Sequence, residues 1–197
     1  MSALAEALRL TRRALDERGL RYALVGGLAV SVRAEPRFTR DVDVVVAVGS
    51  DAEAEELVRG LLDTGWRPLL QVEQGGTGRL ATVRLAPPAA AVPEGIVVDL
   101  LFASSGVEPE LVAAAEPVAV FEGTAFPVAT SPYLLALKVL AQDERRPQDR
   151  ADAAALLADL GSSGLQQART ILRSIEERGY HRGKDLLAEL DELLRRA

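Results

Sequence analysis

The sequence predicts an α+β protein, in which a mixed β-sheet flanked by helices is followed by a C-terminal region made of helices. Short valine-rich runs alternate with segments of helical apolar spacing as far as residue 130. Beyond that point only helical patterns occur, and 197 residues suit one domain with a helical appendage. We therefore expect an α/β core over residues 1–130 and a helical region over 131–197 that packs on it.

Seven segments have the apolar or alternating pattern that is typical of β-strands. They cover residues 22–25, 41–48, 66–72, 79–85, 96–102, 118–121 and 125–128. Glycine-rich turns are expected at residues 74–78 and 122–124, and the second of these turns closes a hairpin.

Helical spacing marks eight further segments. They cover residues 4–18, 28–33, 51–62, 108–115, 131–141, 149–160, 165–178 and 183–196. Asp51 is the expected N-cap of the third helix. Ser131 is the expected cap of the fifth, with Pro132 at its first position, and Gly161 is expected to end the sixth.

Composition and charge exclude several classes of function. The chain has no cysteine, which excludes disulfides, thiolate metal sites and a cysteine nucleophile. It has no apolar run of the ~20 residues that span a bilayer and no signal-peptide core, so we expect a cytoplasmic protein without a membrane partner. A net charge of −6 argues against binding nucleic acid by bulk electrostatics. This charge does not exclude a local basic patch, and Arg33, Arg37 and Arg40, which cluster just before the aspartate pair, would be such a patch.

Two aspartates in a valine run are the most informative feature of the sequence. In Asp41-Val42-Asp43-Val44, strand alternation places both acids on one face and both valines in the core. Two carboxylates held this close repel each other. A divalent cation removes that conflict, so the pair predicts a metal site.

Two further features support this interpretation. Gly26-Gly27 follows a strand and opens a helix, which lets backbone N–H groups approach a phosphate. Asp99 lies alone in an apolar strand, where a carboxylate is costly unless it is paired or bound to metal. Each has a simpler interpretation, since Gly-Gly is commonly just a turn and Asp99 could be a buried acid paired with an arginine. Together the three acids predict an oxygen-only site for Mg²⁺ or Mn²⁺.

The order and spacing of these motifs resemble those of the nucleotidyltransferase superfamily of the DNA polymerase β type. Its pattern is a glycine pair, a short spacer, Asp-x-Asp and a third acid on a neighbouring strand, which Gly26-Gly27, Asp41, Asp43 and Asp99 match. The AbiEii-like toxin branch is the most similar. Residues 131–141 resemble its helix with a functional lysine, here Lys138. Residues 145–152 resemble its Lys-Asp-x-x-Asp motif, with Asp149, Asp152, and Gln148 in place of the lysine.

The resemblance covers about residues 21–160 and implies a chemistry: transfer of a nucleoside monophosphate from an NTP to an acceptor hydroxyl, with release of pyrophosphate. Asp41 and Asp43 would hold the metal bound to the triphosphate, and Asp99 would complete a second metal site. Gly26 and Gly27 would contact the β,γ-phosphates. The cations implied at a phosphate or a nucleic-acid acceptor are Lys138, Arg37 and Arg40.

Several alternatives stay open. Lys138 could be a surface lysine of an amphipathic helix, and Asp149 and Asp152 could be first-turn acids favoured by the helix dipole. The resemblance implies a toxin that acts on RNA, such as tRNA, with a cognate antitoxin. A small-molecule nucleotidyltransferase of the antibiotic-modifying type and a non-catalytic NTP- or protein-binding module are the other candidates.

Overall fold

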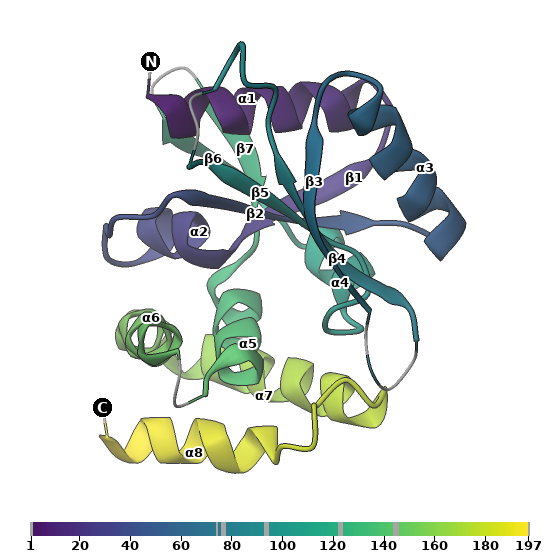
Figure 1. Cartoon of the computed structure of the whole chain (residues 1–197). Coiled ribbons are helices and arrows are strands. Elements are labelled where there is room, and N and C mark those ends of the chain that lie inside the picture. The colour runs from purple at the N-terminus through teal and green to yellow at the C-terminus, as the bar shows by residue number, and fades with distance from the viewer. Residues whose placement is uncertain are drawn as a thin grey trace.

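A computed structural model describes residues 2–73, 75, 78–92, 95–121, 124–143 and 146–196. The described residues form a seven-stranded mixed sheet with helices on both faces and a group of helices at the C-terminus (Figure 1), which confirms the predicted fold class. The strands are β1 (Arg21–Val25), β2 (Asp41–Ala47), β3 (Arg67–Glu73), β4 (Leu80–Ala86), β5 (Val97–Leu101), β6 (Glu116–Phe121) and β7 (Thr124–Val128). The helices are α1 (Ala3–Asp16), α2 (Gly26–Arg33), α3 (Asp51–Leu62), α4 (Glu108–Ala113), α5 (Ser131–Ala141), α6 (Pro147–Ala158), α7 (Gly161–Glu177) and α8 (Leu186–Arg196).

Strand β2 lies in the middle of the sheet, whose order is β3-β4-β5-β2-β1-β7-β6. It pairs antiparallel with β1 and parallel with β5. A central strand is covered on both faces, which explains why Val42, Val44, Val45 and Val46 are all fully buried. The valine run is therefore the centre of the hydrophobic core.

The two faces of the sheet have different partners. Helices α1 and α3 cover one face, where Leu15 and Leu61 lie beside Leu100 of β5. Helices α2, α4 and α5 lie on the other side (Figure 1). Because side chains alternate along a strand, Asp99 points away from α1 and towards α5. The acids of β2 and β5 thus face the C-terminal helices.

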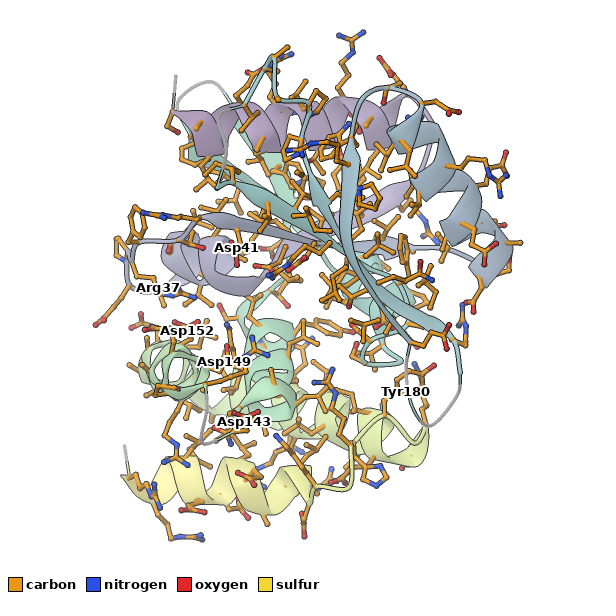
Figure 2. The ribbon with its side chains drawn as sticks, viewed as in Figure 1. Arg37, Asp41, Asp143, Asp149, Asp152 and Tyr180 are labelled. Carbon is orange, nitrogen blue, oxygen red and sulfur yellow. The ribbon has the colours of Figure 1, made fainter. Side chains whose placement is uncertain are left out.

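Helix α5 is the centre of the C-terminal group. It packs against α2 of the core and against α6, α7 and α8, and Leu134, Leu135 and Val139 are buried in these contacts. The end of α7 is fastened to the loop after β5, because the Arg178 guanidinium donates to the Gly106 carbonyl and to Glu110. The Tyr180 ring, labelled in Figure 2, packs closely on the same glycine, since a Cβ at Gly106 would lie 2.6 Å from a ring carbon.

Some predicted boundaries are wrong for physical reasons. Ser50, not Asp51, caps α3 by accepting from the Glu53 N–H, while Asp51 accepts from Arg79 and from the Leu80 N–H. Helix α5 begins at Ser131, with Thr130 as its N-cap. Gly161 has a φ of 62° and begins α7 four residues before the predicted start. Helix α8 begins at Leu186 instead of residue 183.

Parts of both predicted turns, residues 74, 76, 77, 122 and 123, lie outside the described residues, as does Arg145. None of the described helices is long and apolar enough to cross a membrane.

Candidate active site between the sheet and helix α5

Asp41 and Asp43 lie on one face of β2, as the alternation predicts. Both side chains are half-buried, whereas their neighbours Val42 and Val44 are completely buried on the opposite face. Asp43 pairs in register with Asp99 of β5, so these two carboxylates lie side by side on adjacent strands. The sheet register therefore brings together the three acids that the sequence singles out.

Arg84 of β4 contacts two of the three acids. It pairs in register with Asp99, and its guanidinium binds that carboxylate through two contacts, Nε to Oδ1 at 2.8 Å and Nη2 to Oδ2 at 2.6 Å. Its Nη2 also lies 3.7 Å from Oδ2 of Asp41. Asp99 is thus a buried acid paired with an arginine, which is the simpler of its two predicted interpretations.

The environment of Asp43 disfavours a negative charge. Burial raises the pKa of the Asp43 carboxyl to about 7, and the charges of Asp99 and Asp41 act in the same direction. Lys138 and Arg84 act in the opposite direction without cancelling the effect. A carboxylate with this environment gains stability from any additional cation that comes near it.

The glycine pair fits tightly between the charged groups. Gly26 has a φ of 66°, and a Cβ at this position would lie 2.0 Å from Oδ2 of Asp43. A Cβ at Gly27 would lie 2.3 Å from Nη2 of Arg37. Helix α2 begins at Gly26, and within the described residues no side chain caps this end. The first N–H groups of α2 therefore remain available beside Asp43.

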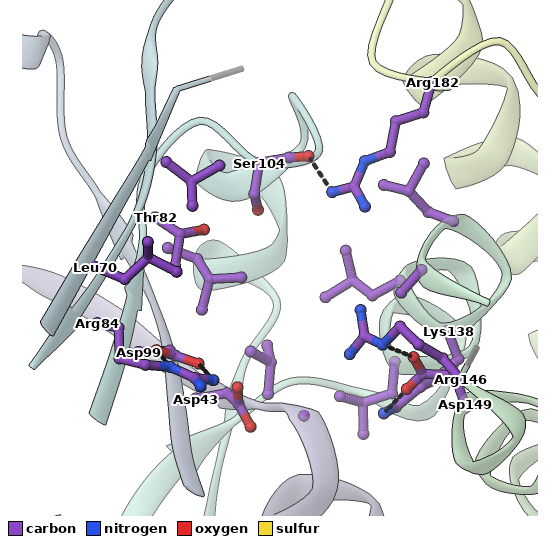
Figure 3. A pocket seen from close by; sticks show the side chains of 18 residues that line it. Asp43, Leu70, Thr82, Arg84, Asp99, Ser104, Lys138, Arg146, Asp149 and Arg182 are labelled. Carbon is purple, nitrogen blue, oxygen red and sulfur yellow. Dashed lines mark hydrogen bonds and ion pairs between the residues drawn. The ribbon is translucent and has the colours of Figure 1, made fainter. Parts of the chain in front are cut away.

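A cavity of about 430 Å³ lies between the sheet and α5 (Figure 3). Asp43, Arg84 and Asp99 form one wall, with Thr82 and Leu101 beside them. The opposite wall is made of side chains from α5 and from the segments around α6 and α8, namely Leu134, Leu137, Lys138, Leu140, Ala141, Arg146, Asp149 and Arg182. The cavity has the size of a small-molecule site and joins an acidic wall to an apolar one.

Lys138 is buried within a cluster of charges rather than exposed. It is only 7% accessible, and its Nζ lies 2.6 Å from Asp149 and 2.8 Å from Asp152. The interpretation of Lys138 as a surface lysine is therefore wrong. Asp149 and Asp152 are also buried, so the helix dipole alone does not account for them. Burial by itself would raise the pKa of Asp152, but hydrogen bonds from Arg37, Lys138 and Gln148 hold it below its usual value.

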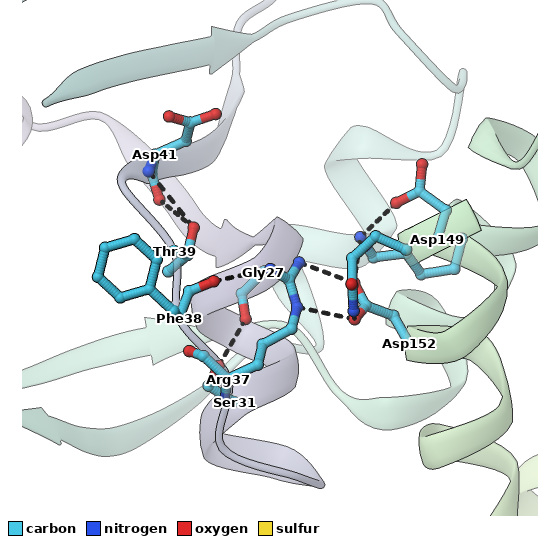
Figure 4. A network of polar contacts seen from close by, with 10 residues as sticks. Gly27, Ser31, Arg37, Phe38, Thr39, Asp41, Asp149 and Asp152 are labelled. Atoms are coloured by element: carbon cyan, nitrogen blue, oxygen red, sulfur yellow. Dashed lines mark hydrogen bonds and ion pairs between the residues drawn. The ribbon is translucent and has the colours of Figure 1, made fainter. Parts of the chain in front are cut away.

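Arg33, Arg37 and Arg40 do not form a common basic patch. Figure 4 shows Arg37 reaching across to α6, where its Nε lies 2.8 Å and its Nη2 2.9 Å from the two oxygens of Asp152. Arg33 pairs with Glu116 and donates to two carbonyls at the end of β7. Arg40 is exposed and lies over the ring of Phe38. Arg33 and Arg37 thus form ion pairs with acids that are distant in sequence, Glu116 and Asp152, and these pairs connect separate segments of the fold.

Three arginines of the cavity were missed by the sequence analysis. Arg84 could have been found, because strand alternation puts Thr82 and Arg84 on the face opposite Val83 and Leu85. Arg182 donates to the Ser104 carbonyl and has no carboxylate partner among the described residues, and Arg146 pairs with Asp149. No periodicity marks these two, which lie in connecting segments.

Across the described ranges, no three His, Cys, Asp or Glu side chains are arranged to hold a metal ion. The metal assignment stays a prediction.

Comparison with known proteins gives one family and several structures. The sequence matches the family described as "Nucleotidyl transferase AbiEii toxin, Type IV TA system" over residues 9–197. No curated protein matches it. The solution structure of the antibiotic-resistance factor ANT(2″)-Ia has a TM-score of 0.55 at 15% identity and covers 100% of both chains.

Two further solved structures are similar. An antigenic nucleotidyltransferase-like protein from Paracoccidioides brasiliensis has a TM-score of 0.50 at 18% identity, with 92% of this chain and 89% of that chain covered. A crystal structure of ANT(2″)-Ia in complex with adenylyl-2″-tobramycin has a TM-score of 0.52 at 13% identity, with 84% and 92% covered. At these identities the likeness establishes the fold.

Proposed function

Because the chain belongs to the family of AbiEii nucleotidyl transferase toxins, we propose that it transfers a nucleoside monophosphate from an NTP to a hydroxyl of an RNA acceptor. In this reaction a bond forms between the acceptor oxygen and the α-phosphorus. The bond from the α-phosphorus to the bridging oxygen breaks, pyrophosphate leaves, and the hydroxyl proton passes to water. The observation that carries the proposal is the group of three acids beside the free end of α2: Asp43 and Asp99 line the cavity, and Asp41 lies on the same face of β2 as Asp43.

The donor set fits a hard divalent cation such as Mg²⁺ or Mn²⁺. All three acids are carboxylates, and Asp43 lies where burial and neighbouring negative charge favour an added cation. Asp41 and Asp43 are the residues that would hold such an ion, with Asp99 beside them as the third carboxylate. A bound divalent ion supplies Lewis-acid stabilisation of the phosphoryl oxygens.

The start of α2 is the proposed phosphate-binding element. The backbone N–H groups that follow Gly26 and Gly27 have no intrahelical partners, and the positive end of the helix dipole lies there. Neither Gly26 nor Gly27 carries a side chain, so a phosphate can approach the backbone closely at this end of α2. We propose that this end of α2 binds the β,γ-phosphates of the NTP.

Lys138 contributes positive potential from the opposite wall of the cavity. Its charge favours the ionised form of Asp43. Asp149 and Asp152 hold the ammonium at 2.6 and 2.8 Å, and Asp152 is held in turn by Arg37 of the core. We propose that Lys138 faces the phosphates of a bound NTP and that Asp152 is a positioning residue. Arg40, which is exposed, is the proposed contact to the acceptor.

Arg182 in the cavity lining favours an anionic acceptor. Arg146 and Arg182 both line the cavity, and Arg182 has only a carbonyl partner among the described residues. A phosphate of RNA would pair with the guanidinium of Arg182, whereas a polycationic acceptor such as an aminoglycoside would gain no ion pair from it. The net charge of −6 gives no general attraction to RNA, so we expect contact to be local to these arginines.

One assay tests the proposal. The protein is incubated with Mg²⁺, each α-labelled NTP in turn, and either total tRNA or a panel of aminoglycosides and lincosamides. Label on RNA with the intact chain, lost in Asp41→Asn and kept in the exposed-site control Asp63→Asn, is the expected result. Label on a small acceptor and not on RNA would instead support a small-molecule nucleotidyltransferase of the antibiotic-modifying type. Binding of NTP without any transfer would leave a non-catalytic module.

The family description also supports a protein partner, because it assigns the family to type IV toxin–antitoxin systems. We propose a cognate antitoxin that counteracts the transfer activity in the cell. Induced expression of this chain in bacteria should stop growth, whereas Asp41→Asn should not. Co-expression of the adjacent reading frame should restore growth if that frame encodes the antitoxin.

A further inference from the structure

A guanidinium lies between the carboxylates of the active site, and no sequence motif assigns it a role. Arg84 binds both oxygens of Asp99, at 2.8 and 2.6 Å, and its Nη2 also lies 3.7 Å from Asp41 (Figure 3 shows the Asp99 pair). The fork of an arginine matches a carboxylate geometrically, so this pair is of the strong, directional kind. Arg84 therefore occupies the position at which Asp99 would meet a metal ion.

The backbone fixes this arrangement. Arg84 pairs in register with Asp99 across β4 and β5, and Asp99 pairs in register with Asp43 across β5 and β2. The three side chains consequently form one row on one face of three adjacent strands. Arg84 starts from a strand inside the sheet rather than from a loop, so its base is held beside Asp99 whatever the position of the C-terminal helices.

The net charge of the three acids and Arg84 is balanced by one divalent ion. Asp41, Asp43 and Asp99 carry −3 when ionised, and Arg84 reduces this to −2. An arginine remains protonated at every accessible pH. Arg84 therefore cannot give way by losing its proton. A second divalent ion on Asp99 would have to break both contacts and lie beside a permanent positive charge.

We propose that Arg84 is the second cation of this active site, so that the carboxylate row holds one divalent ion on Asp41 and Asp43 and holds a guanidinium on Asp99. This inference rests on the proposed function for the identity of the site. Arg84 lines the cavity and uses Nε and Nη2 on Asp99, so further N–H donors of its guanidinium are not taken up by that pair. In a complex with substrate, those donors bind phosphoryl or acceptor oxygens at the place where a second ion would otherwise lie.

The test is to count bound Mn²⁺. Purified full-length protein is titrated with Mn²⁺ alone, and the electron paramagnetic resonance signal of free Mn²⁺ gives the ions bound per chain. The double variant Asp41→Asn/Asp43→Asn gives the background of unrelated acidic sites. Arg84→Ala frees Asp99, Arg84→Gln does so with less loss of side-chain volume, and Arg84→Ala/Asp99→Asn removes the carboxylate as well. Thermal unfolding confirms that each variant is folded.

We expect one ion above background for the natural chain, two for Arg84→Ala and Arg84→Gln, and one again for Arg84→Ala/Asp99→Asn. Two ions on the natural chain would overturn the inference and leave metal-dependent transfer intact. If Arg84→Ala or Arg84→Gln is folded and still binds only one Mn²⁺ above background, the inference is also overturned. If the natural chain binds no Mn²⁺ above background, both this inference and the metal of the proposed function are wrong. The transfer assay with and without Mg²⁺ tests the metal of the proposed function independently.

Discussion

Gly26 and Asp43 face each other so closely that no side chain fits between them. A Cβ at Gly26 would lie 2.0 Å from Oδ2 of Asp43, and the backbone of Gly26 is left-handed, with a φ of 66°. The turn that begins α2 and the central acid of β2 therefore form one unit. This unit places the free end of a helix directly beside a carboxylate, and only glycine permits it.

Gly26→Ala is expected to abolish NMP transfer, because the added methyl group displaces the Asp43 carboxylate. Gly19→Ala is the matched control, since Gly19 has a similar φ of 63° and a Cβ at that position would meet no atom within 4 Å. Both variants lose about 1 kcal/mol of stability from the left-handed backbone. Thermal unfolding and the transfer assay separate the two effects, and equal activity in both variants would contradict the contact.

The ionisation of Asp43 should make the metal-free protein less stable as pH rises. The pKa of Asp43 is raised to about 7, so between about pH 4 and 7 the folded chain holds a proton that the unfolded chain has lost. Stability from this group is present below pH 4 and falls as pH approaches 7. Melting temperatures of the natural chain and Asp43→Asn across this range should converge at low pH and diverge towards neutrality in favour of Asp43→Asn. Parallel curves would show that Asp43 titrates normally.

Removal of Lys138 should destabilise the protein strongly. Lys138→Met keeps the length of the side chain but leaves Asp149 and Asp152 buried with one cation fewer, and breaking a buried ion pair in this way costs about 3–5 kcal/mol. Arg13→Ala, which removes an exposed pair with Glu17, should cost less than about 1 kcal/mol. Denaturant unfolding measures both, and equal losses would argue against the cluster.

Leu69 and Leu70 of edge strand β3 allow a test of the cavity wall. They are 51% and 55% exposed, but Leu70 lines the cavity, whereas Leu69 lies outside that lining, at a register shift of β3 against β4. Leu70→Trp narrows the cavity and is expected to raise the KM for NTP or acceptor several-fold without changing the melting temperature. Leu69→Trp should leave the kinetics unchanged. Steady-state kinetics measures both variants, and the same KM in Leu70→Trp and Leu69→Trp would contradict the assigned cavity.

The sequence alone predicted that Asp41 and Asp43 lie on one face of a strand, and the structure confirms it. Val42 and Val44, which alternate with the two acids, are buried on the opposite face. The family resemblance implied that Asp99 would lie on a neighbouring strand, and β5 does pair with β2. The division of the chain near residue 130 and the metal assignment remain predictions. The helix boundaries failed where a cap or a left-handed glycine decided them, as at Ser50 and Gly161.

The sequence by itself therefore determined the fold class, the acidic face of β2 and the glycine pair before it, since these follow from local periodicity and backbone freedom. Only the tertiary structure decided how the charges pair. Arg84 meets Asp99 through the register of β4 and β5, Lys138 is enclosed by two acids of α6, and Arg37 reaches Asp152 across 115 residues of sequence. Ion pairs between distant segments depend on which side chains the packing brings within a few ångströms, and no local pattern in the chain encodes that choice.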